Sequence, residues 1–391
     1  MRLKRVCVLG ATGSIGKSTL DLVAQHPDRF QLFSASAHSD VDGMLEIVKA
    51  FSPVQVCMKD IAAGDQLINR LKQLRLHRTE VVVGSEALNS LAAHSQVDTV
   101  VAGIVGIAGL LPVWSAVAAG KSVLLANKEA LVCAGELFVQ QAKQSGACIL
   151  PIDSEHNAIF QCLGPAYACF SRPESVRRLL LTASGGPFRD WPVEAIRSAT
   201  PEQAVKHPNW VMGPKISVDS ATMMNKALEL IEAHWLFSMP AEEIEVVIHP
   251  QSIIHSMVEF WDGSTLAQLG TPDMRTPIAH AMAWPDRMDS QVESLNWSQL
   301  RELHFEVPDD TRFPSLAFAR QALLDGPVAS ICLNAINEVM VARFLKGACS
   351  FGAIFDELDK GLQRFTGRFL VPTSLDEVMA MDTEIRAFYA H

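Results

Sequence analysis

Two acidic side chains, Asp153 and Glu155, have the spacing of a site for a hard cation, and a later segment with Glu229 is predicted to form the second half of that site. Asp153 and Glu155 are two residues apart after a short apolar stretch, and an extended backbone places both carboxylates on one side. Glu229 lies in a helical pattern, where Asn225 and Lys226 share its face. Carboxylates without a zinc-like Cys/His pattern select Mg²⁺ or Mn²⁺. The residues therefore predict a divalent-metal site. The alternatives are a capping role for Asp153 or Ser154 and a surface ion pair between Lys226 and Glu229.

Hydroxyl and cationic groups near these carboxylates in the sequence suit a phosphate ester. Ser184 follows a predicted strand and precedes two glycines, so it offers a hydroxyl and flexible backbone donors. A helix predicted over Ser220–Leu236 puts Ser220 near its N-terminus, where the helix dipole favours an anion, and Lys226 adds a full charge. The glycine- and proline-containing segment His207–Gly213 is predicted to be a lid that excludes water.

A glycine-rich loop near the start of the chain indicates a dinucleotide. It follows an apolar strand, opens a helical pattern and reads Gly10-Ala11-Thr12-Gly13-Ser14-Ile15-Gly16. Glycines let backbone N–H groups approach a pyrophosphate at the positive end of a helix, although such turns also serve plain packing.

The end of the second predicted strand favours NADP over NAD. NAD sites usually place an acid there for the ribose 2′-hydroxyl, but this chain has no carboxylate before Asp40. Ser36, His38 and Ser39 are candidate donors to a 2′-phosphate. At the end of a later strand, Asn127 and Lys128 are predicted to orient the nicotinamide half or the substrate, with a solvated strand-to-helix connection as the alternative.

The first 150 or so residues alternate apolar strands with helices, which predicts an α/β domain with a Rossmann-like, doubly wound parallel sheet. Its predicted helices include Ser14–Gln25, Val41–Phe51 and Leu137–Gln144. The predicted strands are Val6–Leu9, Gln31–Ser36, Val54–Met58, Glu80–Val83, Thr99–Ala102, Ser122–Ala126 and Ala147–Leu150.

Beyond Pro151 the pattern predicts an α+β domain with a mixed sheet. Its elements are a strand over Arg178–Thr182 and a hairpin of Ser252–Phe260 with Ser264–Leu269, turning at Asp262-Gly263. Four later segments with apolar residues three and four apart predict a small C-terminal helical bundle: Leu316–Leu324, Ala329–Phe344, Phe351–Phe365 and Ser374–Tyr389. We expect domains over 1–150, 151–285 and 312–391, with a linker over 286–311.

Composition limits the classes of protein. The chain has 391 residues, 49% hydrophobic and 19% charged, with a formal charge of −10 and no dense Lys/Arg run, which argues against nucleic-acid and membrane partners. Eight scattered cysteines without a C-x-x-C pair predict reduced thiols in a cytoplasmic protein. The uncharged stretch Thr99–Gly120 is long enough to cross a bilayer, but its glycines and Pro112 predict a buried strand followed by a helix.

Together these motifs resemble the 1-deoxy-D-xylulose 5-phosphate reductoisomerase family, which serves the methylerythritol phosphate route to isoprenoid precursors. The stretches that carry the resemblance are Gly10–Gly16, Leu124–Val132, Pro151–Gln161, Leu181–Phe188, His207–Glu229 and His249–Pro285. The resemblance implies an NADPH domain, a catalytic and dimerisation domain, a C-terminal helical domain, and a cytoplasmic homodimer.

The resemblance also implies roles for individual residues. Asp153, Glu155 and Glu229 would hold Mg²⁺ or Mn²⁺, with Co²⁺ as a further candidate, and would act in catalysis with Lys128 and His207. The substrate set comprises Lys128, Ser154, Glu155, Ser184, His207, Trp210, Ser220, Asn225, Lys226 and Glu229. The NADPH set comprises Thr12, Gly13, Ser14, Ile15, Ser36, His38, Ser39, Asn127, Glu129 and Gly213.

The expected activity is rearrangement of 1-deoxy-D-xylulose 5-phosphate followed by reduction with NADPH. Two alternatives remain open at this point. One is a metal-dependent NADP dehydrogenase of another phosphorylated sugar or hydroxy acid, which would not rearrange the carbon skeleton. The other is a non-catalytic NADP-sensing module, which would have no use for the three carboxylates.

Overall fold

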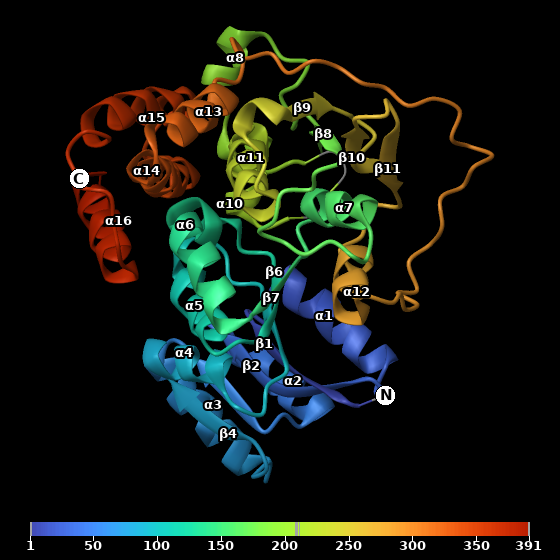
Figure 1. Ribbon diagram of the computed structural model, residues 1–391. Helices are drawn as coiled ribbons and strands as arrows, with labels where there is room; N and C mark the ends of the chain where they lie inside the picture. Colours follow the sequence, from blue (N-terminus) through green and yellow to red (C-terminus); the bar gives the residue numbers. More distant parts are fainter. Residues whose placement is uncertain (1, 208–209, 211, 390–391) are drawn as a thin grey trace. The chain divides into compact units, whose positions relative to one another are not determined.

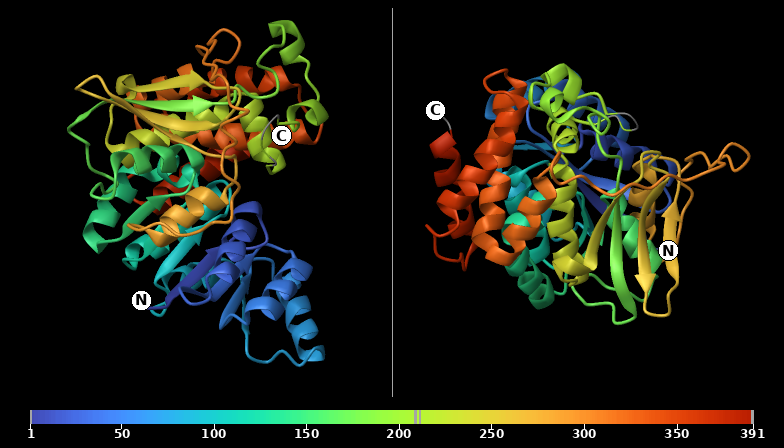
Figure 2. Two further views of the ribbon diagram at one scale, coloured as in Figure 1. Left: turned by 90° about the vertical axis from the view of Figure 1, so that its right-hand side faces the viewer. Right: turned by 90° about the horizontal axis from the view of Figure 1, so that it is seen from above.

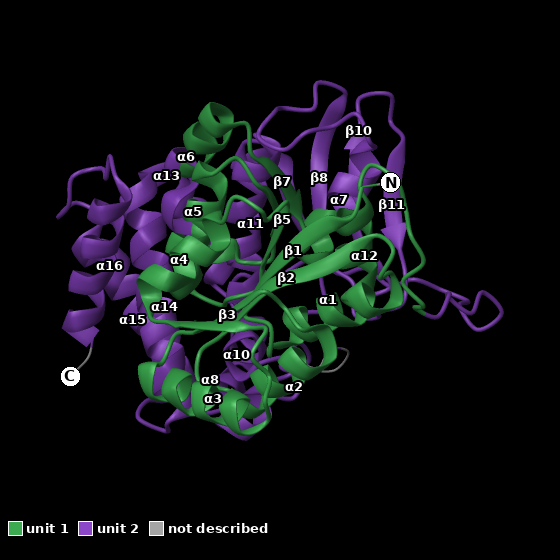
Figure 3. Ribbon diagram, turned by 90° about the horizontal axis from the view of Figure 1, so that it is seen from below, with its two compact units in different colours: residues 1–130, 138–157, 273–292 green, residues 131–137, 158–272, 293–391 purple. Residues whose placement is uncertain are grey.

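The computed structural model describes residues 2–207, 210 and 212–389. The chain divides into two compact units, which Figure 3 draws in different colours. Unit 1 comprises Met1–Ala130, Phe138–Asn157 and Asp273–Val292. Unit 2 comprises Leu131–Leu137, Ala158–Pro272 and Glu293–His391.

Unit 1 is built on a seven-stranded parallel sheet, as the sequence predicts. Its strand order is β4-β3-β2-β1-β5-β6-β7, so the direction of winding reverses between β1 and β5. In β1 the residues Val6–Leu9 are fully buried, which explains why such strands read as short uninterrupted apolar runs. The strands are β1 Lys4–Leu9, β2 Phe30–Ala37, β3 Gln55–Met58, β4 Glu80–Val83, β5 Thr99–Ala102, β6 Ser122–Leu125 and β7 Cys148–Pro151.

Helices cover both faces of this sheet. Helix α1 packs with α12, which was not predicted, on one face, and α4 packs with α5 on the other (Figure 3). Aspartates cap α2 and α3, where Asp40 accepts from the backbone N–H of Gly43 and Asp60 from that of Ala63. The helices are α1 Ser14–Gln25, α2 Val41–Phe51, α3 Ile61–Gln73, α4 Ser85–Ala93, η1 Ile107–Gly109, α5 Leu110–Ala118 and α12 Arg275–Ala283. Helices α6 Lys128–Ser145 and α7 Ser154–Leu163 belong in part to each unit.

Unit 2 contains the predicted mixed sheet, in the order β11-β10-β8-β9. Figure 2 (right) shows β8, β10 and β11 side by side. Strands β10 and β11 form the predicted antiparallel hairpin, β10 is antiparallel to β8, and β8 is parallel to β9, a strand that was not predicted. The bounds are β8 Val176–Ala183, β9 Ile244–Ile248, β10 Ile254–Phe260 and β11 Thr265–Leu269. Short helices α8 Val193–Arg197 and α9 Pro201–Ala204 follow β8, and η2 Ala241–Glu243 precedes β9.

The predicted single helix over Ser220–Leu236 is wrong. Two helices occupy this region, α10 Pro214–Ala221 and α11 Met224–Phe237. The break has a local cause: the Thr222 hydroxyl bonds back to the Val218 and Asp219 carbonyls and accepts from the Met224 N–H, while Met223 takes a left-handed φ of 61°. Ser220 therefore lies in the last turn of α10, not at a helix N-terminus, so the dipole argument for an anion at Ser220 fails.

The C-terminal part of unit 2 is helical, as predicted (Figure 1). Its helices are α13 Ser315–Asp325, α14 Pro327–Leu345, α15 Phe351–Phe365 and α16 Leu375–Tyr389. Among the described residues, α14 alone has the length and hydropathy of a membrane span, and 72% of its most apolar stretch is buried within the protein. The predicted division of Thr99–Gly120 into a strand and a helix is confirmed by β5 and α5.

Aromatic packing around Phe351 gives a test of this helical region. Phe351 is fully buried, and its ring lies 5.2 Å from that of Phe188 and 5.4 Å from that of Phe344. We expect Phe351→Ala to lower the free energy of unfolding by roughly 3–5 kcal/mol, because a buried aromatic ring leaves a cavity. Chemical denaturation followed by tryptophan fluorescence measures the change. Phe388→Ala, at a residue 45% exposed, should cost clearly less, and equal losses would contradict the packing described.

Candidate active site

The carboxyl ends of the parallel strands in unit 1 gather the candidate cofactor residues. The reversal of strand order at β1 and β5 makes this edge the expected ligand crevice. Gly10, directly after β1, has a φ of 74°, and a Cβ there would lie 2.9 Å from the carbonyl oxygen of Gly103, directly after β5. Glycines therefore let the two loops meet at the point where a dinucleotide is expected.

The loop after β1 presents the start of α1. Gly13 is the N-cap residue in an extended conformation, and Gly13 and Ser14 are exposed. A Cβ at Gly16 would lie 2.4 Å from the Ala11 carbonyl oxygen, so only glycine allows this tight turn into the helix. Backbone N–H groups at the helix start are the groups that bind a pyrophosphate.

His38 and Ser39, directly after β2, and Ser36, near its end, are the residues predicted to contact a 2′-phosphate. His38 and Ser39 are exposed, whereas Ser36 is buried and its hydroxyl oxygen accepts from the Gly10 N–H at 3.1 Å. Asp40, the first carboxylate after the strand, accepts from the Gly43 N–H at 2.9 Å and so caps α2. That carboxylate is already used for capping, which leaves the exposed polar positions before it for a 2′-phosphate.

Asn127 is buried rather than solvated, so the alternative of a solvated connection is wrong. Its amide nitrogen donates to the carbonyl oxygens of Ile104 at 2.7 Å and Gly106 at 2.9 Å, and its oxygen accepts from the Ala130 N–H at the start of α6. Asn127 therefore fixes the loop after β5. The sequence did not indicate that this loop belongs to the candidate site. Knowledge of the strand order, which makes β5 the neighbour of β1, would have pointed to this loop. Glu129 beside it is also buried.

Asp153 and Lys128 form a buried ion pair in unit 1. The Lys128 ammonium lies 2.7 Å from one carboxylate oxygen of Asp153, and the His156 ring nitrogen lies 3.3 Å from the other. Burial by itself would raise the pKa of Asp153, but Lys128 and His156 together hold it well below its usual range. The hydroxyl of the next residue, Ser154, donates to the Glu155 carboxylate. Asp153 is thus an ionised oxygen donor with Glu155 close by in the chain, a donor set that fits a hard cation.

Glu229 of α11 is almost fully buried in unit 2. The Asn225 amide and the Lys226 ammonium both donate to its carboxylate. Lys226 is 3% exposed and Glu229 1% exposed, so the alternative of a surface ion pair is wrong. Keeping two opposite charges and an amide together in a protein interior costs desolvation energy. Buried ionisable groups arranged in this way are typical of functional sites.

Ser184 and His207 are joined by a hydrogen bond in unit 2. The ring nitrogen Nδ1 of His207 accepts from the Trp210 N–H at 2.9 Å, which assigns the proton to Nε2. Nε2 then donates to the Ser184 hydroxyl oxygen at 2.9 Å, and the Gly186 N–H donates to the same oxygen at 3.2 Å. With its oxygen accepting two hydrogen bonds, Ser184 directs its own proton to a further acceptor such as a phosphate oxygen.

The turn after β8 packs on the last turn of α10. Gly186 has a φ of 69°, and a Cβ there would lie 2.6 Å from the carbonyl oxygen of Ser220. The structure therefore brings Ser184 and Ser220 into neighbouring segments of unit 2. Gly213, predicted to bind the cofactor, is the N-cap residue of α10. Of the predicted lid, Pro208, Asn209 and Val211 lie outside the described residues.

Two further histidines of unit 2 are buried and lie against aromatic rings. His249 is fully buried, donates from Nδ1 to the His304 carbonyl oxygen at 2.8 Å, and stacks on Phe305. His255 is 7% exposed and its ring lies 6.1 Å from that of Trp210. Burial lowers the pKa of His255 to about 4, so this ring is neutral at physiological pH.

Comparison with known proteins covers nearly the whole chain. Three family models match, 1-deoxy-D-xylulose 5-phosphate reductoisomerase over residues 6–135, its C-terminal domain over 149–237, and the DXP reductoisomerase C-terminal domain over 269–388. The 1-deoxy-D-xylulose 5-phosphate reductoisomerase of Aromatoleum aromaticum is 54% identical over 385 residues, which span 98% of this chain and 95% of the relative. The chain belongs to this family. The DXP reductoisomerase of Methylococcus capsulatus is 51% identical over 98% of this chain and 97% of its own length.

Solved DXP reductoisomerase structures share the fold. A crystal structure of DOX-P reductoisomerase with NADPH, fosmidomycin and magnesium has a TM-score of 0.93 and 44% identity, covering 99% of this chain and 98% of that one. The Zymomonas mobilis enzyme in complex with NADPH has a TM-score of 0.90 and 43% identity, covering 100% and 98%. The resemblance and the fold class predicted from the sequence are thereby confirmed.

The neutral state of His207 gives a test of the Ser184 geometry. Burial lowers the pKa of His207 to about 4, well below its ordinary 6.5. Because the unfolded chain binds this proton more readily, the stability contributed by neutral His207 is complete above about pH 6.5 and is lost as the pH falls towards 4. We expect the His207 ring to titrate near pH 4 by NMR, and His207→Gln to lose less stability than the parent protein between pH 7 and 5. A ring midpoint above pH 6 would contradict the neutral donor assigned here.

Proposed function

We propose that this chain converts 1-deoxy-D-xylulose 5-phosphate into 2-C-methyl-D-erythritol 4-phosphate, using NADPH and a divalent cation, in the non-mevalonate route to isoprenoid precursors. The proposal rests mainly on the buried set of Asn225, Lys226 and Glu229 in a chain of this family. A relative of the same fold binds NADPH, fosmidomycin and magnesium.

The NADPH assignment follows the carboxyl edge of the sheet in unit 1. The loop of Thr12, Gly13, Ser14 and Ile15 would bind the pyrophosphate through backbone N–H groups at the start of α1. His38 and Ser39, exposed after β2, would contact the 2′-phosphate, with Ser36 beneath them. Asn127, Glu129 and Gly213 complete the proposed cofactor set. The buried amide of Asn127 would act by shaping the loop after β5.

The metal assignment is Asp153, Glu155 and Glu229. All three offer carboxylate oxygens, the donors that Mg²⁺ prefers, and Mn²⁺ or Co²⁺ would fit the same donors. A bound cation supplies Lewis acidity, which stabilises negative charge on the substrate oxygens while the carbon skeleton rearranges. Lys128 keeps Asp153 ionised until a cation binds, and its ammonium would then be available to orient the reacting oxygens.

The phosphate end of the substrate would be held by Ser184, Ser220, Asn225 and Lys226. Ser184 donates through the proton that His207 and Gly186 leave unengaged, and Lys226 supplies the charge. Ser154 and His207 would contact the sugar, and Trp210 would close over it to exclude water. NADPH supplies the hydride that reduces the rearranged aldehyde before it leaves the site.

An activity assay tests this proposal. Incubation with 1-deoxy-D-xylulose 5-phosphate and Mn²⁺ or Mg²⁺ should oxidise NADPH, followed by absorbance, and EDTA should stop the reaction. NMR of the product should show a methyl branch, which separates the proposal from a dehydrogenase that leaves the skeleton intact. NADPH binding with neither metal binding nor turnover would favour the sensing module.

The role of Glu229 can be tested in the same assay. We expect Glu229→Gln to lower kcat by at least about 100-fold while the protein stays folded, because a carboxylate ligand is replaced by a weaker neutral donor. Glu245→Gln is the matched control, since Glu245 is half exposed on β9 and pairs with Arg178. Similar activity of the two variants would remove Glu229 from the metal site.

We further propose that the protein is a cytoplasmic homodimer joined through unit 2. Strand β11 lies at one end of the four-stranded sheet, where edge strands favour pairing with another chain. Leu266 lies on β11 and is 50% exposed, and Trp261, in the turn before this strand, is 64% exposed, so both apolar side chains lie at this sheet edge. Sedimentation should show two chains, and Leu266→Arg should shift the protein towards one. Leu324→Arg, at a residue 78% exposed on α13, is the control and should stay dimeric. A parent protein that sediments as one chain would contradict the proposal.

A further inference from the structure

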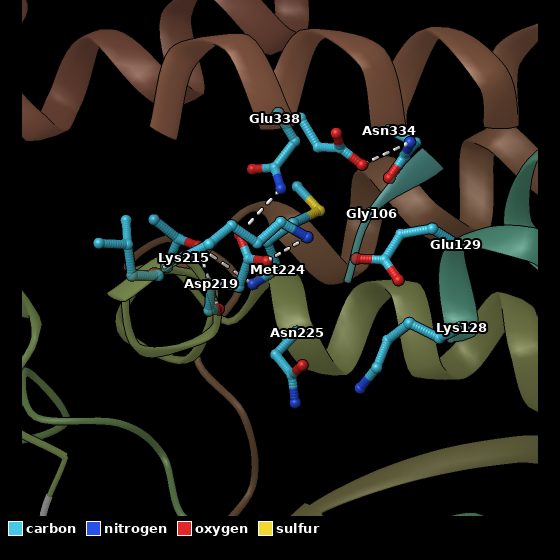
Figure 4. Close-up of polar contacts among 12 residues, drawn as sticks. Gly106, Lys128, Glu129, Lys215, Asp219, Met224, Asn225, Asn334 and Glu338 are labelled. Carbon is cyan, nitrogen blue, oxygen red and sulfur yellow. Dashed lines mark hydrogen bonds and ion pairs between the residues drawn. The ribbon is translucent and has the colours of Figure 1, made fainter. Parts of the chain in front are cut away.

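Asp219 is a buried charge directly before the proposed phosphate ligand Ser220. It lies in the last turn of α10 and is 1% exposed. One carboxylate oxygen lies 2.8 Å from the ammonium of Lys215, one turn earlier on the same helix. The other accepts from the amide nitrogen of Asn337 at 2.8 Å, and Asn337 lies on α14. Figure 4 shows Lys215 and Asp219 together on α10.

Asn337 makes this bond at a cost. The residue is fully buried in a largely apolar helix, and its amide oxygen has no hydrogen-bond partner among the described residues. A buried polar atom without a partner is unfavourable, and an apolar side chain at this position would avoid that penalty. The bond to Asp219 is therefore the feature that explains an asparagine here, because it fixes one orientation of α10 against α14.

Two other contacts hold the same turn of α10. The hydroxyl of Ser315, fully buried at the start of α13, donates to the carbonyl oxygen of Thr222 at 2.7 Å. In addition, the backbone of Gly186 lies against the carbonyl of Ser220. Ser220 is thus fixed between the turn after β8 and two helices of the C-terminal part of unit 2, none of which carries a residue in the proposed metal site.

We propose that Asp219 and Asn337 are positioning residues for the substrate phosphate. They hold the last turn of α10 so that the Ser220 hydroxyl meets the phosphate together with Ser184. This inference rests on the proposed function, since it takes Ser220 as a phosphate ligand. It assigns the C-terminal helices a part in substrate affinity although they contribute no ligand to the substrate.

Asn337→Ala tests the inference. The KM for 1-deoxy-D-xylulose 5-phosphate should rise about tenfold, the change expected for one lost buried hydrogen bond, while the KM for NADPH stays within about twofold. Asn334→Ala is the matched control. Asn334 is equally buried on α14, but its amide donates to Glu338 of the same helix at 3.1 Å (Figure 4). Equal effects of the two variants on the sugar-phosphate KM, or equal rises in both KM values for Asn337→Ala, would show a purely structural role and overturn the inference.

A double-mutant cycle with Ser220→Ala separates this inference from the proposed function. If Asn337 acts through Ser220, Asn337→Ala should raise the KM far less in the Ser220→Ala background than in the parent. Ser220→Ala that leaves the KM unchanged would contradict the phosphate assignment itself. A raised KM for Ser220→Ala with additive effects would overturn only the positioning role.

A milder variant covers the case in which Asn337→Ala does not fold. Asp219→Asn keeps the size of the side chain and removes its charge, so it weakens the bonds to both Lys215 and Asn337. It should raise the sugar-phosphate KM in the same direction by a smaller factor, with thermal unfolding recorded to confirm the folded state. A folded Asp219→Asn protein with an unchanged KM would overturn the inference.

Discussion

A charge removed from water must be compensated by an opposite charge or by hydrogen bonds, because its desolvation costs several kcal/mol. This requirement organises the candidate site in both units. Asp153 is paired with Lys128 and His156, Glu229 with Lys226 and Asn225, and Asp219 with Lys215 and Asn337. In each set a lysine lies beside the carboxylate. Each carboxylate therefore has a compensating positive charge when no ligand is bound. For Asp153 and Glu229 the same lysine or amide belongs to the proposed substrate set, and binding would exchange one partner for another.

Much of the fold could be predicted because its elements follow local patterns. The strands of unit 1 are buried on both faces and read as apolar runs between turns, and α1 and α2 begin and end where the sequence indicates. The division of Ser220–Leu236 could not be predicted. Its apolar spacing continues through Met223, but Thr222 turns its hydroxyl back on α10, and Ser315, more than 90 residues later, bonds its carbonyl. Strand β9 and helix α12 were also missed, although Pro240 and Pro250 flank the strand and Pro272 and Pro285 flank the helix.

The kinds of residue in the candidate site could be read from the sequence, but their partners could not. Hard-cation donors, hydroxyls beside glycines and the glycine loop are local signals. Three of the contacts join segments that are more than 20 residues apart in the sequence. They are the hydrogen bond between Ser184 and His207, the ion pair of Lys128 with Asp153, and the hydrogen bond from Asn127 to the loop after β5. His207 is neutral because the fold buries its ring, and the fold buries Asn127 as well. Both facts change the chemistry that the residues can perform.

The cap formed by Asp40 links cofactor choice to the stability of α2. The acid that an NAD-binding protein would present to a ribose hydroxyl is here committed to the Gly43 N–H. Turning that carboxylate towards a ribose would uncap the helix, at roughly 0.5–2 kcal/mol. A redesign for NADH would therefore have to leave Asp40 in place and introduce a new acid at His38 or Ser39, both of which are exposed and carry no cap. Helix capping thus prevents Asp40 from serving as the acid of an NADH site, although Asp40 itself need not contact the cofactor.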